Sequence, residues 1–83
     1  MNIQNATIGT EVVRSKGDYV VGRVGNIIAI DAEKNRAQVS WVTCWGTWVS
    51  FTAIEPTSIP YTITEGSYNK KTGKHSWPKY NRL

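Results

Sequence analysis

Two apolar, β-branched runs flank a short polar segment in residues 19–42, YVVGRVGNIIAIDAEKNRAQVSWV. The first run, residues 19–31, contains Gly22 and Gly25, and glycines within a strand pattern indicate a bend or a close approach of two backbones. The polar segment DAEKN has the composition of a hairpin turn, because Asp accepts hydrogen bonds from turn backbone and Asn tolerates the left-handed conformation. The sequence therefore predicts two antiparallel strands, at residues 19–31 and 36–42.

The second of these strands alternates in polarity. Successive side chains of a strand point to opposite faces, so Ala37, Val39 and Trp41 share one face, which we expect to lie in the core. The polar side chains that alternate with them are expected to point outward: Arg36, Gln38 and Ser40.

Short runs of the same kind continue along the chain and predict strands at residues 11–14, 47–51 and 59–64. A single helical turn is predicted at residues 52–56, with Ile54 at one end of the core. Helical periodicity is absent, so we predict an all-β fold. About five short strands leave costly open edges unless the sheet curls and closes, which favours a small five-stranded barrel.

The segment Gly22-Arg23-Val24-Gly25-Asn26-Ile27-Ile28-Ala29-Ile30 resembles the core of KOW modules in its spacing of glycine and aliphatic residues. Residues 48–56 resemble the strand and helical turn that close Tudor-like barrels. Both modules are SH3-like barrels, so the resemblance implies this fold, with the helical turn before the last strand. KOW-type domains typically contact RNA, and Tudor-like domains typically capture methylated side chains, but fold alone does not determine function.

Charge separates the chain into two parts. Residues 1–64 hold five basic and five acidic residues, whereas residues 65–83 hold five basic residues and Glu65 alone, so the tail carries the whole net charge of +4. We therefore divide the chain into an N-terminal extension (1–7), an SH3-like barrel (8–64) and a basic C-terminal extension (65–83). A neutral body with a basic tail is typical of chains that contact nucleic acid.

Aromatic residues are interleaved with the cations of the tail, namely Tyr68, Trp77 and Tyr80. Cations neutralise phosphates and aromatic rings stack on bases, so this pattern favours contacts with single-stranded nucleic acid or RNA. Two alternatives remain: a solvated tail that only aids solubility, and rings that dock onto the body.

The body offers two further groups of candidate residues. Trp45, at a predicted hairpin tip, and Trp48, opposite in face to Val49, are expected to be exposed anchors for a base or a partner pocket. Trp41 is assigned to the core. Alternatively, the aromatic cluster of Tyr19, Trp41, Trp45 and Trp48, with Asp18 as the acid, forms a cage for a methylated cation.

Basic residues of the body form the second group, a predicted stripe whose alternative is an ordinary solvated surface. The candidate nucleic-acid or partner-binding residues are therefore Arg14, Lys16, Arg23, Arg36, Trp45, Trp48, Lys70, Lys71, Lys74, Trp77, Lys79, Tyr80 and Arg82.

Catalytic and metal-binding patterns are absent from the sequence. A single cysteine, Cys44, and a single histidine, His75, exclude a disulfide framework and disfavour a hydrolytic triad. We expect Cys44 to fill the core and His75 to be solvated, and we predict no enzyme activity, no cofactor and no metal. No apolar run reaches about 18 residues, and the first residues lack the features of a secretory signal, so we expect a cytoplasmic protein without membrane contact.

The sequence thus predicts a non-catalytic module that binds RNA or DNA through its basic tail and exposed aromatics. The alternative is a protein-interaction or self-assembling adaptor that uses the tryptophan patch. Small chains of this kind are frequent among phage and mobile-element accessory proteins that bind a host factor.

Overall fold

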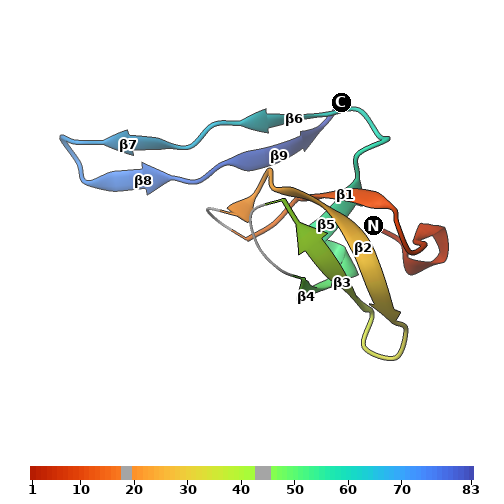
Figure 1. Ribbon diagram of the computed structural model, residues 1–83. Helices are drawn as coiled ribbons and strands as arrows, with labels where there is room; N and C mark the ends of the chain where they lie inside the picture. Colours follow the sequence, from red (N-terminus) through yellow and green to blue (C-terminus); the bar gives the residue numbers. More distant parts are fainter. Residues whose placement is uncertain (18–19, 43–45) are drawn as a thin grey trace.

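The computed structural model describes residues 1–17, 20–42 and 46–83 and is built mainly of strands (Figure 1). Five of them form an antiparallel sheet in the order β4-β3-β2-β1-β5. These strands are β1 (Glu11–Arg14), β2 (Val24–Asp31), β3 (Arg36–Trp41), β4 (Thr47–Ser50) and β5 (Ile54–Pro56). The all-β prediction is confirmed.

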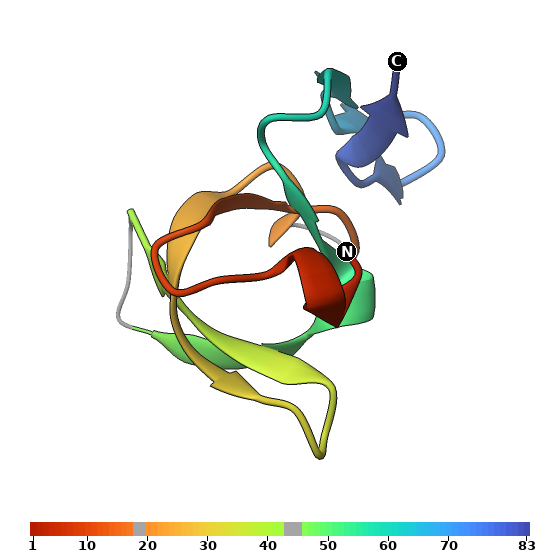
Figure 2. The ribbon, with the colours of Figure 1, turned by 90° about the vertical axis from the view of Figure 1, so that its right-hand side faces the viewer.

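The five-stranded sheet curls around its inner face without closing (Figure 2). In the described part of the chain, no strand pairing joins its edge strands, β4 and β5. The short 3-10 turn η3 (Phe51–Ala53) connects them, and the Ser50 side chain accepts a hydrogen bond from the Thr52 amide at its start. The predicted closed barrel is therefore an open, curled sheet.

Apolar side chains from all five strands and η3 fill the inside of this curl. Trp41 is buried, as predicted, and its indole nitrogen donates to Thr47 Oγ1 at 2.8 Å, so its polar atom is paired. Full burial of an aliphatic or aromatic side chain contributes about 1.5–3 kcal/mol, so this cluster dominates the stability of the fold. The cluster consists of Val12, Ile27, Ala37, Val39, Trp41, Val49, Phe51 and Ile54. Val13 is also buried, on the opposite face of β1 from Val12.

The two glycines of the first apolar run act as predicted. Gly22 has a φ of 95°, and the chain turns there, so β2 begins at Val24 rather than at residue 19. Gly25 lies in β2 where the backbone of β3 passes very close: a Cβ at this position would lie 2.5 Å from the Ser40 carbonyl oxygen. The hairpin between the strands also forms as predicted, with Asn35 in the left-handed conformation at a φ of 51°.

The end of the body differs from the prediction in two respects. The helical turn covers only Phe51–Ala53, and Ile54–Pro56 forms the fifth strand, paired with β1. Residues 59–64 do not close the sheet: β6 (Tyr61–Thr64) pairs with β9 (Lys79–Arg82). The physical reason is that β5 already occupies the free edge of β1, while burial of Ile54 holds β5 in place.

A long two-stranded ribbon therefore projects from the body, and the molecule extends 45 Å along its longest axis (Figure 1). Its outer part pairs β7 (Ser67–Asn69) with β8 (Lys74–Ser76). The ladder is interrupted at Pro78, which has no amide hydrogen to donate and packs beside Gly66. The predicted tail is thus an ordered antiparallel hairpin whose inner half includes β6.

The N-terminal residues cover part of the sheet's interior. The 3-10 turn η1 (Ile3–Asn5) carries Ile3, which packs with Met1 and Ala6 against the buried cluster. The amino group of Met1 donates to the carbonyl oxygens of Phe51 and Ile54, at 2.8 and 2.9 Å. These contacts hold the N-terminal segment to η3 and the start of β5.

Candidate nucleic-acid interface

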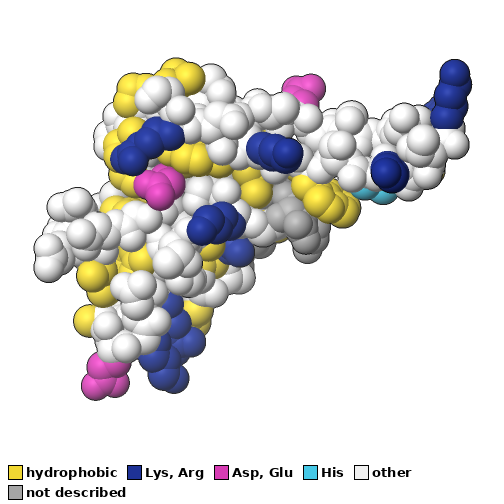
Figure 3. Space-filling view, turned by 180° about the vertical axis from the view of Figure 1, so that it is seen from behind, with side chains coloured by type: hydrophobic (Ala, Val, Ile, Leu, Met, Phe, Trp, Pro, Cys, Tyr) yellow, Lys and Arg dark blue, Asp and Glu magenta, His cyan; other side chains and the backbone are white. Residues whose placement is uncertain are grey.

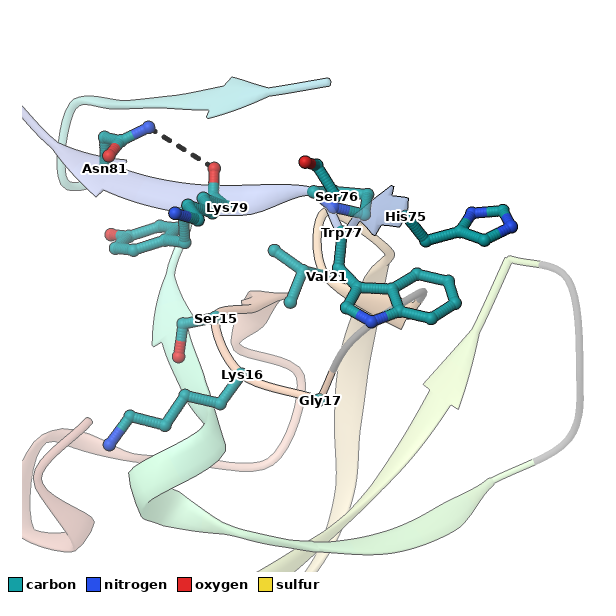
Figure 4. Close-up of a pocket in the computed structure, with 11 residues that line it drawn as sticks. Ser15, Lys16, Gly17, Val21, His75, Ser76, Trp77, Lys79 and Asn81 are labelled. Atoms are coloured by element: carbon teal, nitrogen blue, oxygen red, sulfur yellow. Dashed lines mark hydrogen bonds between the residues drawn. The ribbon is translucent and has the colours of Figure 1, made fainter. Parts of the chain in front are cut away.

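A groove of about 610 Å³ lies between the ribbon and the loop that connects β1 to β2 (Figure 4). The loop contributes Ser15, Lys16, Gly17 and Val21, and the ribbon contributes residues 75–81. Figure 4 shows the Trp77 indole extending from the ribbon toward the loop side of the groove. The groove therefore exists only because the ribbon is folded back over the body.

The electrostatic character of the groove is positive. Lys16 lines it from the loop and Lys79 lines it from β9, and both side chains are exposed. Its lining, within the described ranges, contains no acidic residue. The loop is held in shape by Arg14, whose Nε donates to the Lys16 carbonyl oxygen at 2.6 Å. Two lysines that line a shared hollow are suited to a ligand with several negative charges, such as a phosphate backbone.

Three rings form a stack on one face of the ribbon. The antiparallel register pairs Tyr68 with His75, and Trp77 lies two residues further on the same face of the strand. The Tyr68 and His75 ring centroids are 4.5 Å apart with their planes tilted by 39°, and those of His75 and Trp77 are 5.3 Å apart with nearly parallel planes, at 11°. Tyr68 is 53% exposed and Trp77 is 44% exposed, so the stack presents aromatic surface to solvent.

Tyr80 plays a different part from the other rings of the ribbon. It stacks on Tyr61 at 5.3 Å between centroids, and its hydroxyl is buried without a partner among the described residues. Burial, followed by the negative charge of Glu55, raises the pKa of Tyr80. Ile63, on the neighbouring strand β6, packs against Gly22 and joins the base of the ribbon to the body.

The remaining basic residues of the ribbon lie at its two ends. Lys70 and Lys71 occupy the turn at the tip, Lys74 begins β8, and all three are exposed. Figure 3 shows basic side chains distributed along the ribbon as far as its tip. At the opposite end, Arg82 lines a separate cavity of about 260 Å³ that also includes Glu55. Lys70, Lys71, Lys74 and Arg82 form no ion pair within the part of the chain that the structure describes, whereas Glu55 pairs with the amino group of Met1 at 3.2 Å.

The candidates in the body are dispersed rather than gathered into one stripe. Arg14 and Arg23 line a smaller cavity of about 140 Å³ beside Trp41. Arg36 lies on β3, where its Nε is 3.3 Å from Asp31 Oδ2 and its guanidinium covers the Trp48 ring. Trp48 points outward as predicted. The predictions for Asp18, Tyr19, Cys44 and Trp45 lie outside the described residues.

The groove thus brings together Lys16, Trp77, Lys79 and Tyr80 from the predicted set. Sequence reasoning missed the loop residues Ser15, Gly17 and Val21, because nothing local indicates that the ribbon returns over them. His75 is exposed, as expected for a solvated residue, yet it also joins the aromatic stack. The signal for the stack was the alternation of His75 and Trp77, two residues apart on an extended strand.

A metal site and a membrane-spanning helix are both lacking among the described residues. Over the described ranges, no group of three or more His, Cys, Asp or Glu side chains is arranged to hold a metal ion. The same part of the chain contains no helix with the length and apolar character needed to cross a membrane. Comparisons of the chain with protein-family models, curated proteins and solved structures gave no match.

Proposed function

We propose that this protein is a non-catalytic module that binds nucleic acid through the ribbon and the groove at its base. The observation that carries the proposal is the juxtaposition of Lys16, Lys79 and the exposed ring of Trp77 in one groove without an acidic side chain among its described lining residues. The groove adjoins the segment that carries the whole net positive charge of the chain. Phosphates bind the lysines, and the ring offers a surface on which a base can stack.

The architecture of the body supports its assignment as an SH3-like domain related to KOW or Tudor-like modules. Its fifth strand returns to pair with its first, and a single 3-10 turn precedes that last strand. The two glycines that define the KOW-like spacing make the bend and the close strand approach that this resemblance requires. Such a body serves here as a rigid support that positions the loop at residues 15–17 beneath the ribbon.

The test is a binding titration at several salt concentrations. We expect labelled RNA or DNA oligonucleotides to bind at low salt. The affinity should fall steeply as salt rises, because the counterion release that drives binding contributes less free energy at higher salt concentration. The double variant Lys16→Ala, Lys79→Ala should weaken binding and flatten the salt dependence. Lys34→Ala is the matched control, since it removes a lysine from the β2–β3 hairpin, at the far end of the molecule from the ribbon (Figure 1).

The outcomes distinguish a wrong assignment of the groove from a wrong function. Equal losses in the Lys34→Ala control and the groove variant indicate a general charge effect and contradict the assignment of the groove. Absence of any binding at low salt, for both RNA and DNA, contradicts the proposed function as a whole.

Self-association is the second candidate, favoured by a different surface. Ile28 and Trp48, 42% and 43% exposed, lie on the outer side of the sheet, and the Ile28 side chain reaches toward Gly46 between them. Apolar surface of this kind is typical of an interface with a second copy or another protein. Sedimentation equilibrium over a wide concentration range tests it: a salt-insensitive dimer that is absent in Ile28→Ser supports this function, and a monomer throughout contradicts it.

A further inference from the structure

The outer part of the ribbon is highly exposed to solvent. Every residue of β7 and β8 is exposed, on both faces of the two-stranded sheet. Isolated two-stranded hairpins are marginally stable in water, so an element of this kind is usually completed by what it binds. Its charge indicates the occupant: Lys70, Lys71 and Lys74 surround its tip, and no acidic residue lies between residues 66 and 83.

From these features we infer that the ribbon selects single-stranded nucleic acid over duplex; the inference rests on the proposed function and names its substrate class. The aromatic stack of Tyr68, His75 and Trp77 runs along one face of the ribbon, with lysines beyond each end. Lys70 and Lys71 lie beyond Tyr68 at the tip, and Lys16 and Lys79 lie beyond Trp77 in the groove. A nucleic-acid strand bound along this face would contact lysines at the tip, then the three rings, and then the lysines of the groove.

Stacking distinguishes single strands from duplexes. In a duplex, each base except those at the two ends is covered on both faces by its neighbours, so exposed protein rings have no base surface to contact along its length. In a single strand, bases are free to leave the stack and pack on aromatic side chains. A duplex contacts the ribbon through the lysines alone, whereas a single strand uses both the lysines and the rings.

Tyr68 is the position at which a base extends the stack. One side of its ring faces His75 at 4.5 Å, and more than half of the residue is exposed. It lies on β7, away from the contact of Ile63 with Gly22 that joins the ribbon to the body and from the Tyr61–Tyr80 stack at the ribbon's base. A substitution at Tyr68 therefore removes a stacking surface without disturbing the attachment of the ribbon.

The experiment compares two variants of Tyr68 that separate the ring from other contributions. Tyr68→Leu keeps an apolar side chain but removes the ring, whereas Tyr68→Phe keeps the ring and removes only the hydroxyl. Each is titrated by fluorescence anisotropy with a labelled single strand of about ten nucleotides, within the usual span of single-strand sites. The same measurement is made with a blunt duplex of equal length, and circular dichroism checks that each variant is folded.

We expect the single strand to bind wild type more tightly than the duplex does. Tyr68→Leu should weaken single-strand binding about 5- to 100-fold, the range for removal of one base stacked on a ring. Tyr68→Phe should bind like wild type, and neither variant should change duplex binding or the slope of the salt dependence, since no charge is altered. These results together support the inference.

Two results overturn it in distinguishable ways. If single strand and duplex bind equally and Tyr68→Leu has no effect, the protein still binds nucleic acid, but the selection of single strands by stacking is wrong. If neither oligonucleotide binds at low salt, the proposed function fails and the inference fails with it.

Discussion

The guanidinium carbon of Arg36 lies 4.7 Å from the centroid of the Trp48 ring, so these two outward-facing side chains of neighbouring strands cover each other. Arg36 also pairs with Asp31 in the preceding strand. Both residues were expected to contact a ligand, yet in the folded protein their charged and aromatic groups interact with one another. Their contact stabilises the outer face of the sheet, on a different part of the molecule from the groove.

Removal of this contact should lower stability slightly. We expect the coupling between Arg36 and Trp48, measured by a double-mutant cycle to Ala, to be about 0.5–1 kcal/mol, as for exposed cation–π pairs. The ion pair with Asp31 adds little, because both side chains are partly exposed. Urea unfolding of the two single variants and the double variant gives the coupling. A coupling of zero would show that the ring and the cation do not interact in solution.

Gly25 cannot be replaced without distortion of the sheet. A Cβ there meets the backbone carbonyl of Ser40 at 2.5 Å, and backbone cannot move aside as a side chain can. We expect Gly25→Ala to destabilise the fold by about 1–3 kcal/mol. Gly46→Ala is the control, since a Cβ there meets only side-chain atoms of Ile28 and Gln38, which can rotate away. Equal melting temperatures for the two variants would contradict the close approach of β2 and β3.

The core depends on Ile54, which is fully buried at the start of β5. Ile54→Ala leaves a cavity and should lower the free energy of unfolding by about 2–5 kcal/mol. A domain of this size has little stability to spare, so much of the variant should be unfolded at room temperature. Ile8→Ala, at an aliphatic side chain that is 63% exposed, should change stability by less than about 0.5 kcal/mol. Denaturant titrations followed by tryptophan fluorescence compare the two.

Tyr80 should tolerate removal of its hydroxyl better than an ordinary buried tyrosine does. Its Oη has no hydrogen-bond partner in the described part of the chain, so Tyr80→Phe removes an unpaired polar atom. We expect the variant to be as stable as wild type or more stable by about 1 kcal/mol. Tyr68→Phe, at an exposed site, is the control and should have no effect. A marked decrease of stability in Tyr80→Phe would show that the hydroxyl is paired in solution.

The raised pKa of Tyr80 also predicts the behaviour of the ribbon at alkaline pH. Burial and the charge of Glu55 favour the neutral phenol in the folded state. This contribution is complete below the ordinary tyrosine pKa of about 10 and disappears as the pH rises through the raised value. Wild type should therefore become less stable there, and Tyr80→Phe should be less affected. Thermal melts of wild type and Tyr80→Phe between pH 8 and about pH 11.5, an interval that spans the titration of tyrosine, measure the difference in stability.

The lysines at the ribbon tip should set part of the salt dependence of nucleic-acid binding. For single strands the slope of log affinity against log salt becomes shallower by about 0.7 for each phosphate that the protein no longer neutralises. We expect Lys70→Ala and Lys71→Ala each to reduce the slope by about this amount, and Lys34→Ala to leave it unchanged. An unchanged slope in the tip variants would place the phosphate contacts elsewhere.

Local pattern was sufficient to predict much of the body. The alternation of Ala37, Val39 and Trp41 identified the buried face of β3, because a strand has a fixed side-chain period of two. The bend at Gly22 and the close contact at Gly25 were also predictable, since only glycine has no Cβ to obstruct them. The separation of charge between body and tail is a property of composition and needs no structure.

The sequence could not predict which strands pair with one another at the end of the chain. Nothing in residues 61–64 distinguishes a strand that closes a sheet from one that pairs with residues 79–82, because pairing depends on which edge is free in three dimensions. The free edge of β1 is occupied by β5, so β6 pairs with β9 instead and forms the ribbon. The groove between Lys16 and Lys79, and the stack through His75, arise from this long-range pairing. Composition thus determined which side chains the protein carries to a ligand, and the tertiary structure alone decided which of them meet.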